Sequence, residues 1–261
     1  MAALIAVLVF FLSVAEGCSQ EVIHSGFSLT RDDLKEMISG IPPDAQKKVL
    51  AEPEEFLELM GKALDGPQDL LLLVDKKNGL PSGSVPADLV TLDGYPLSLN
   101  KKGLSLRLIL IPDLLEMAEA ARAQGAPLPL QSSYRSYARQ TTLYRYALKT
   151  QSREEVEKEL APPGHSQHQL GTAIDFGSIT LSFANTSAGQ WLFANAWMFG
   201  FTLSFPKGME KETGYSYEPW HYRYVGKPAA ALIQGFFGGS QQGFLEFYAE
   251  TNGAFRQARL Q

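Results

Sequence analysis

The chain has 261 residues, of which 45% are hydrophobic and 20% charged, a composition typical of a folded protein with one domain of ordinary size. The formal net charge is -5 and no run of Lys and Arg stands out, so a nucleic-acid partner is not expected. Cys18 is the only cysteine, which excludes disulfide bonds within the chain and a zinc site built on thiolates.

The first residues predict export. Met1–Leu12 reads MAALIAVLVFFL, which is too short for a good membrane-spanning helix and typical of the hydrophobic part of a signal peptide. SVAEG and then Cys18 follow, so residues 1–18 are interpreted as a signal peptide or a lipoprotein signal with Cys18 as a lipid anchor. Ordinary cleavage and an uncleaved anchor stay open. Each alternative places the domain in the periplasm or on the outer face of the cytoplasmic membrane.

Residues 19–66 are interpreted as a tether and a helical preface that packs or spaces the domain. Thr30 has the residue type of a helix N-cap and is followed by acidic residues. Pro42 and Pro43 start a second helix, and Pro53–Leu64 reads as a third. No catalytic signature falls in this part.

Residues 67–261 are interpreted as the main domain, with strands and helices interspersed. An apolar, strand-like run begins at Leu70, and LPLQSSYRS (128–136) reads as a buried strand that leads into a polar turn. Further strands are expected at 172–176, 201–205 and 221–225. Helices are expected at 111–125, 137–150, 153–160, 189–198, 228–236 and 242–250. The predicted fold class is α+β, with a small, mainly antiparallel sheet flanked by helices.

Two segments carry unusual residue combinations, PPGHSQHQLGTAIDF (162–176) and TGYSYEPWHYRYVG (213–226). Imidazole and carboxylate are the ligands that zinc takes where thiolate is absent. His168, Asp175 and His221 are therefore the candidate zinc ligands, in a cleft at the sheet, with a fourth position for water. Glycine at 171 permits the bend that brings the first two together.

Two further side chains suit peptide hydrolysis. Glu218 lies three residues before His221 and is the candidate general base. Arg135, in the segment SSYRSYARQ, can grip a terminal carboxylate with two hydrogen bonds. His165 is expected to be a loop residue rather than a ligand, and His24 to be uninvolved.

The chain resembles the VanY-like D-alanyl-D-alanine carboxypeptidases, a family of zinc enzymes that also includes L,D-carboxypeptidases and some cell-wall endopeptidases. The family motif SxHxxGxAxD stands here as SQHQLGTAID (166–175), and ExWH stands as EPWH (218–221). The resemblance covers about Leu70 to Val225. It implies zinc binding by the two histidines and the aspartate, a catalytic base at Glu218, and substrate contacts by Arg135, Gln140 and Ser166. Gln167 departs from the family, where many members have Glu.

These observations predict a zinc-dependent metallocarboxypeptidase that removes the C-terminal D-alanine of peptidoglycan stem peptides and acts as a monomer. Within the class, L,D-carboxypeptidase or stem-peptide endopeptidase activity stays open. An alternative of another class is a noncatalytic, zinc-containing module that binds wall peptides.

Overall fold

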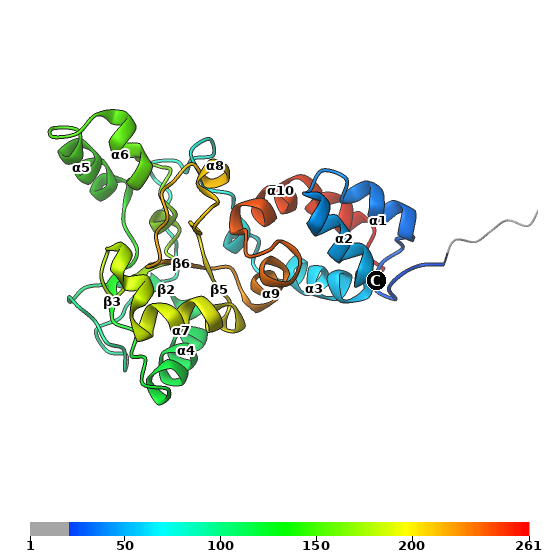
Figure 1. Ribbon diagram of the computed structural model, residues 1–261, viewed down its shortest axis with the longest axis horizontal. Coiled ribbons are helices and arrows are strands. Elements are labelled where there is room, and N and C mark those ends of the chain that lie inside the picture. Colours follow the sequence, from blue (N-terminus) through cyan, green and yellow to red (C-terminus); the bar gives the residue numbers. More distant parts are fainter. Residues whose placement is uncertain (1–20, 261) are drawn as a thin grey trace, which may run out of the picture.

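A computed structural model describes residues 21–260 of the chain. Figure 1 shows two groups of elements side by side, one built around β-sheets and the other made of helices. The predicted signal segment and Cys18 lie outside the described residues, so these predictions stay predictions. Within the described part, no helix combines the length and apolar character needed to cross a membrane.

The central sheet has the strand order β3–β4–β6–β5, and its neighbouring strands are antiparallel. Its strands are β3 (Leu130–Ser132), β4 (Ala173–Phe176), β5 (Phe201–Leu203) and β6 (His221–Tyr224). Every residue of β4 and β6 is buried, which is the pattern of interior strands. A second antiparallel pair consists of β1 (Leu89–Thr91) and β2 (Ser105–Arg107). The predicted α+β class with a small antiparallel sheet is therefore confirmed.

Helices cover the sheet and extend beyond it (Figure 1). Leu114 and Met117 of α4 and Leu192 of α7 share one hydrophobic core with Ile174 and Phe176 of β4. The helices of this group are α4 (Ile111–Ala123), α5 (Tyr137–Ala147), α6 (Arg153–Glu159), α7 (Ser187–Asn195) and α8 (Glu210–Thr213). Short 3₁₀ segments join them: η1 (Gln68–Leu71), η2 (Leu108–Leu110), η3 (Gln167–Leu170), η4 (Leu181–Asn185) and η5 (Ala196–Phe199).

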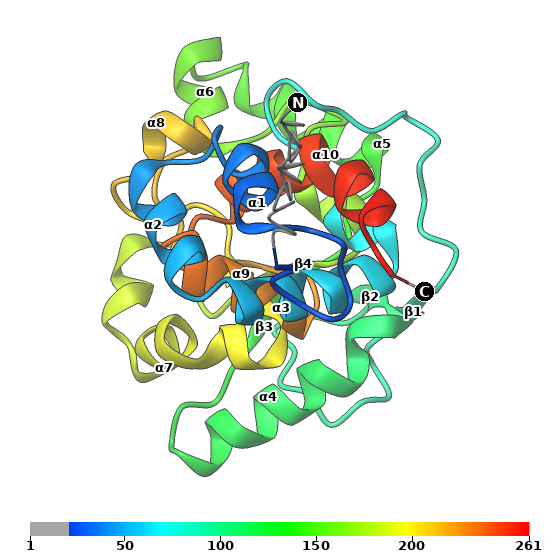
Figure 2. The same ribbon diagram turned by 90° about the vertical axis from the view of Figure 1, so that its right-hand side faces the viewer.

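The remaining five helices form what we call the helical lobe: α1 (Arg31–Met37), α2 (Pro43–Ala51), α3 (Pro53–Asp65), α9 (Lys227–Phe236) and α10 (Gln241–Gln257). The two ends of the described chain meet in this lobe, where Phe27 pairs with Arg259 (Figure 2). Thr30 caps α1 through a reciprocal capping box with Asp33, as its residue type predicts. The lobe has its own core, in which the buried ring of Phe56 on α3 packs edge-on against Phe236 on α9, with 5.4 Å between the ring centroids.

One predicted strand is wrong. The run that begins at Leu70 lies in η1 and an irregular segment instead of a strand. The guanidinium of Arg223 is fully buried, and its Nη2 donates hydrogen bonds to the carbonyl oxygens of Leu70 and Leu72. These carbonyls are satisfied by a side chain, so the apolar run needs no neighbouring strand.

Candidate metal centre

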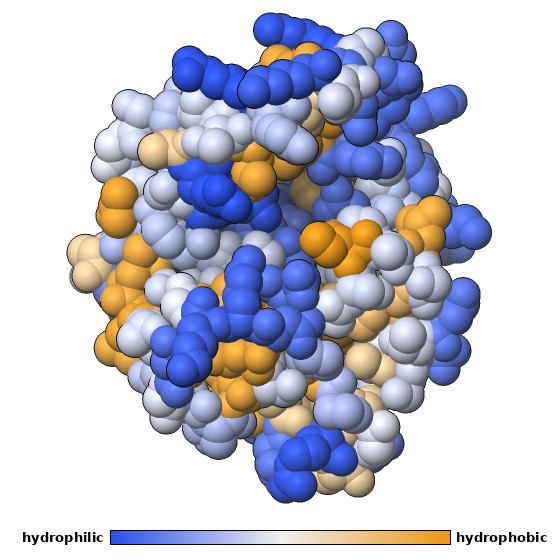
Figure 3. Space-filling view, turned by 90° about the vertical axis from the view of Figure 1, so that its left-hand side faces the viewer, coloured by the Kyte–Doolittle hydropathy of each residue, from blue (hydrophilic) through white to orange (hydrophobic). Residues whose placement is uncertain are grey.

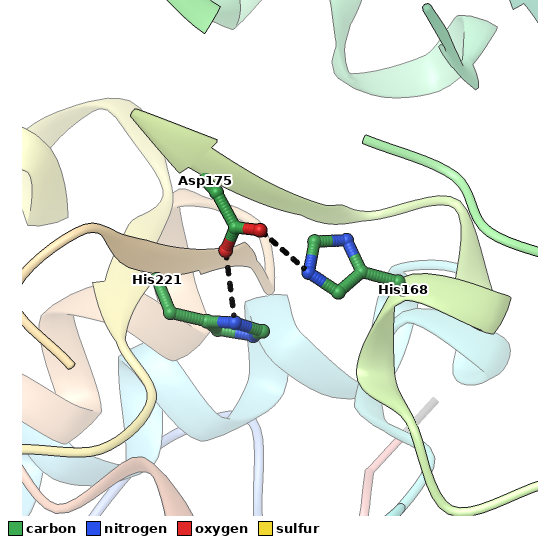
Figure 4. Close-up of side chains that lie close together, drawn as sticks. All are labelled: His168, Asp175 and His221. Atoms are coloured by element: carbon green, nitrogen blue, oxygen red, sulfur yellow. Dashed lines mark ion pairs between the residues drawn. The ribbon is translucent and has the colours of Figure 1, made fainter. Parts of the chain in front are cut away.

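Sheet register brings the predicted ligands to one place. Asp175 on β4 is directly opposite His221 on β6, so their side chains project from the same face of the sheet. His168 reaches the same point from η3, which ends at Gly171 in the left-handed conformation (φ +70°). In Figure 4 the Asp175 carboxylate lies between the two imidazoles. Its Oδ2 is 3.1 Å from His168 Nε2, and its Oδ1 is 3.2 Å from His221 Nδ1.

Hydrogen bonds fix the tautomers of both histidines. Nδ1–H of His168 donates to the carbonyl oxygen of Ser133 at 2.7 Å, which leaves Nε2 without a proton. Nε2–H of His221 donates to Gln167 Oε1 at 3.3 Å, which leaves Nδ1 without a proton. Two bare nitrogens therefore face the carboxylate, and Asp175 Oδ1 is buried without a hydrogen-bond donor. Lone pairs that face one another in a buried place are stabilised when a proton or a metal ion lies between them.

The protonation states suit a divalent metal. Burial lowers the pKa of His168 to about 4, and the Asp175 carboxylate offsets only part of that shift. Burial opposes ionisation of Asp175, but its pKa lies well below the usual range, because a proton shared among these groups is held by His168 or His221 rather than by the carboxylate. The candidate ligand atoms of the three residues lie within 4.8 Å of one another. One nitrogen from each imidazole and one carboxylate oxygen are a donor set that fits Zn²⁺ and leaves one position open.

Glu218 lies beside this centre. Its Oε2 is 3.5 Å from His221 Nδ1, and only 7% of the residue is exposed. A turn closes between the two residues, because the backbone N–H of His221 donates to the carbonyl oxygen of Glu218. Burial raises the pKa of Glu218 well above its usual range, and the carboxylates of Asp175 and Glu159 raise it further. A buried carboxylate with a raised pKa near the open metal position is suited to accept and return a proton.

Arg135 places a positively charged side chain beside the metal centre. Its backbone N–H donates to the carbonyl oxygen of His168, and its guanidinium is held by Gln140 Oε1 at 3.0 Å and Ser132 Oγ at 3.2 Å. Nη2 is 3.9 Å from Asp175 Oδ2. The side-chain amide nitrogen of Gln140 donates to a backbone carbonyl, so both ends of this amide are engaged. Gln140 therefore fixes the direction of Arg135, and its predicted contact with substrate stays a prediction.

The site opens into a cleft of about 1010 Å³, lined by the three metal-binding candidates together with Arg135, Glu218 and other residues. Figure 3, which looks at the left-hand side of Figure 1, shows this face hollowed near its centre, with hydrophobic and hydrophilic residues around the hollow. Ser166 is buried and lines the cleft, where its predicted substrate contact can be made.

The other two histidines have different surroundings. His165 also lines the cleft, but its Nδ1–H donates to the carbonyl oxygen of Asp75, and it lies outside the ligand cluster. His24 lies in the helical lobe, with Nε2 3.0 Å from Glu58. Neither was predicted as a ligand.

Sequence reasoning missed several contacts of the site. Ser132, the carbonyl of Ser133, and Gln241 on α10 hold Arg135, His168 and Gln167 in place. Residues 132 and 133 begin the segment SSYRSYARQ that contains the candidate arginine, so their nearness to Arg135 in the sequence could have indicated that they belong to the site. No local sequence pattern indicates that Gln241 belongs to the site, because only the folding of the chain brings α10 next to Gln167.

The sequence of the chain is similar to that of known proteins. Residues 103–227 match the family VanY, described as D-alanyl-D-alanine carboxypeptidase. A D-alanyl-D-alanine carboxypeptidase of Enterococcus faecalis is 32% identical over 71% of this chain and 69% of its own length. The chain belongs to the VanY family. The protein YodJ of Bacillus subtilis is 35% identical, over 66% of each chain. The chain spans 60% of the length of a further relative, the D-alanyl-D-alanine carboxypeptidase of Enterococcus faecium.

Solved structures of the family have the same fold. The LdcB LD-carboxypeptidase aligns with a TM-score of 0.64 and 33% identity, over 70% of this chain and 88% of that one. A mutant of the vancomycin-resistance D,D-pentapeptidase VanY, solved in complex with Zn(II), aligns with a TM-score of 0.56 and 30% identity, over 68% of this chain and 99% of that one. The family membership predicted from the two motifs is confirmed.

Proposed function

We propose that this protein is a zinc-dependent carboxypeptidase that removes the C-terminal D-alanine of peptidoglycan stem peptides. The observation that carries the proposal is the pair of bare histidine nitrogens facing Asp175, with a buried carboxylate and a fixed guanidinium beside them. The membership in the VanY family and the Zn(II) complex of a family member support it.

The side chains divide the work of hydrolysis. Bound Zn²⁺ supplies Lewis-acid polarisation of the scissile carbonyl and lowers the pKa of water. Arg135 binds the free carboxylate of the terminal residue and so places the scissile bond in front of Glu218. Glu218 accepts a proton from the attacking water and returns it to the leaving amine.

Both D,D- and L,D-bonds fit this arrangement, because each places a D-alanine carboxylate within the reach of Arg135. The LdcB structure aligns with a higher TM-score than the VanY mutant, and its name specifies LD-carboxypeptidase activity. Cleavage of the L,D-bond of a tetrapeptide is therefore a second candidate, alongside the D,D-bond of a pentapeptide.

The test is D-alanine release from defined penta- and tetrapeptides, followed by mass spectrometry. We expect release that is abolished by a chelator, restored by Zn²⁺, and reduced about 10²–10⁴-fold by Glu218→Gln, which removes the base but keeps its shape. The zinc content of the variant should match that of the wild type. Zinc binding without turnover by the wild type would favour the noncatalytic wall-peptide module instead.

We also propose that the protein works outside the cytoplasmic membrane, where peptidoglycan lies. The apolar run Met1–Leu12 and the small residues before Cys18 support this proposal. Cell fractionation and mass spectrometry of the N-terminus test it. A lipid on Cys18 that disappears in Cys18→Ser would distinguish a lipoprotein from an ordinarily cleaved signal peptide.

A further inference from the structure

A series of buried side chains, linked by hydrogen bonds, connects the metal centre with the helical lobe. Gln167 Oε1 accepts hydrogen bonds from His221 Nε2 at 3.3 Å and from Ser204 Oγ at 2.7 Å. Gln167 Nε2 donates to Gln241 Oε1 at 3.2 Å. Gln241 Nε2 in turn donates to Thr202 Oγ1 at 2.7 Å and to the Thr202 carbonyl oxygen at 3.4 Å. Both glutamines are almost fully buried, with 6% and 1% of their surfaces exposed.

The contact of Gln241 with Thr202 determines which group donates in each of these hydrogen bonds. The carbonyl oxygen of Thr202 can only accept, so it takes the amide nitrogen of Gln241, whose oxygen then faces Gln167. Gln167 consequently presents its own nitrogen to Gln241 and its oxygen to His221. An oxygen at that point selects the His221 tautomer with the proton on Nε2, and Nδ1 is left bare toward Asp175.

We infer that Gln167 and Gln241 are positioning residues for the metal ligand His221, which tie the zinc centre to the first turn of α10. The inference rests on the proposed zinc-dependent function and adds to it two residues outside the ligand set. The two histidines differ in this respect. A backbone carbonyl, that of Ser133, orients His168, whereas side chains orient His221 and can therefore be replaced.

The position of Gln241 gives the helical lobe a role at the site. α10 starts at Gln241, and its N-cap Ser240 donates a hydrogen bond to Glu212 of α8. The next residue, Gln242, donates to Asp75 Oδ2 at 2.8 Å. The first turn of α10 is thus fixed to the sheet-containing part at three successive residues, and the middle one supports His221.

The test measures zinc affinity by competition with a chromophoric chelator. Gln167→Met keeps the volume of the side chain but removes the acceptor, and partners that orient metal ligands contribute about 10–100-fold in metal affinity. We expect a loss of that size, and a smaller loss for Gln241→Met, because Ser204 still holds Gln167. Gln167→Glu keeps an acceptor for Nε2–H but cannot donate to Gln241 Oε1, so we expect it to bind zinc more tightly than Gln167→Met.

Gln242→Met is the matched control. It removes a buried glutamine from the same turn of α10, but its partners are Asp75 and Glu246 rather than Gln167. Zinc affinity should stay at the wild-type value in this variant. Thermal unfolding of the metal-free variants separates a loss of zinc affinity from a general loss of stability, and Gln241→Met replaces Gln167→Met if the latter does not fold.

The results distinguish the two proposals. If Gln167→Met binds zinc as tightly as the wild type, or if Gln242→Met loses as much affinity as Gln167→Met, the positioning role is wrong while the proposed enzyme stands. If the wild type neither binds zinc nor releases D-alanine, the proposed function itself fails.

Discussion

Removal of the Arg135 guanidinium tests the proposed recognition of the substrate's free C-terminus. Only 17% of this side chain is exposed, and Ser132 and Gln140 hold it next to the metal centre. A substrate carboxylate bound there forms a buried, hydrogen-bonded charge pair, and truncation of one partner of such a pair costs about 2–5 kcal/mol. At about 1.36 kcal/mol for each factor of ten, Arg135→Met should lower kcat/KM by about 30-fold to several thousand-fold.

The assay compares each peptide with its C-terminal amide. The wild type should strongly prefer the free carboxylate, whereas Arg135→Met should cleave both forms at similar low rates. Arg139→Met, one turn further along the chain on an exposed part of α5, is the control and should behave as the wild type. A wild type that cleaves the amide and the free acid equally well would refute the reasoning and favour an endopeptidase.

Two further variants test packing, one beside the metal centre and one in the core of the helical lobe. Gly171→Ala places a side chain on a residue in the left-handed conformation, where its Cβ would lie 2.9 Å from Leu89 Cδ2, so we expect weaker zinc binding and lower stability. Gly103 has a similar φ and open space around it. Gly103→Ala should therefore lower the free energy of unfolding only by the backbone strain, roughly 1–2 kcal/mol. Equal effects of the two substitutions on zinc affinity would contradict the close-packing argument. Phe56→Ala opens a cavity in the core of the helical lobe and should lower the free energy of unfolding by about 3–5 kcal/mol in denaturant titrations. A loss below about 1 kcal/mol would show that the lobe collapses around the missing ring.

Local patterns in the sequence correctly predicted most of the helices. Thr30 caps α1, and Pro43 and Pro53 occupy the first positions of α2 and α3, because capping and proline geometry act within a few residues. The apolar run at Leu70 misled the strand prediction. Apolar content alone does not specify a strand, and the hydrogen bonds from Arg223 that satisfy this run come from a residue about 150 positions away.

The sequence by itself also identified the three candidate metal ligands and Glu218. Ligand chemistry restricts such a site to a few residue types, and the resemblance of two short segments to the motifs of the VanY-like family indicates which positions they are, without a fold. Only the tertiary structure decided how these residues are held. The pairing of Asp175 with His221 depends on sheet register, and the support from Gln241 depends on the docking of α10. Strand register and helix docking depend on which residues, far apart in the sequence, are buried against one another, so no local sequence pattern predicts them.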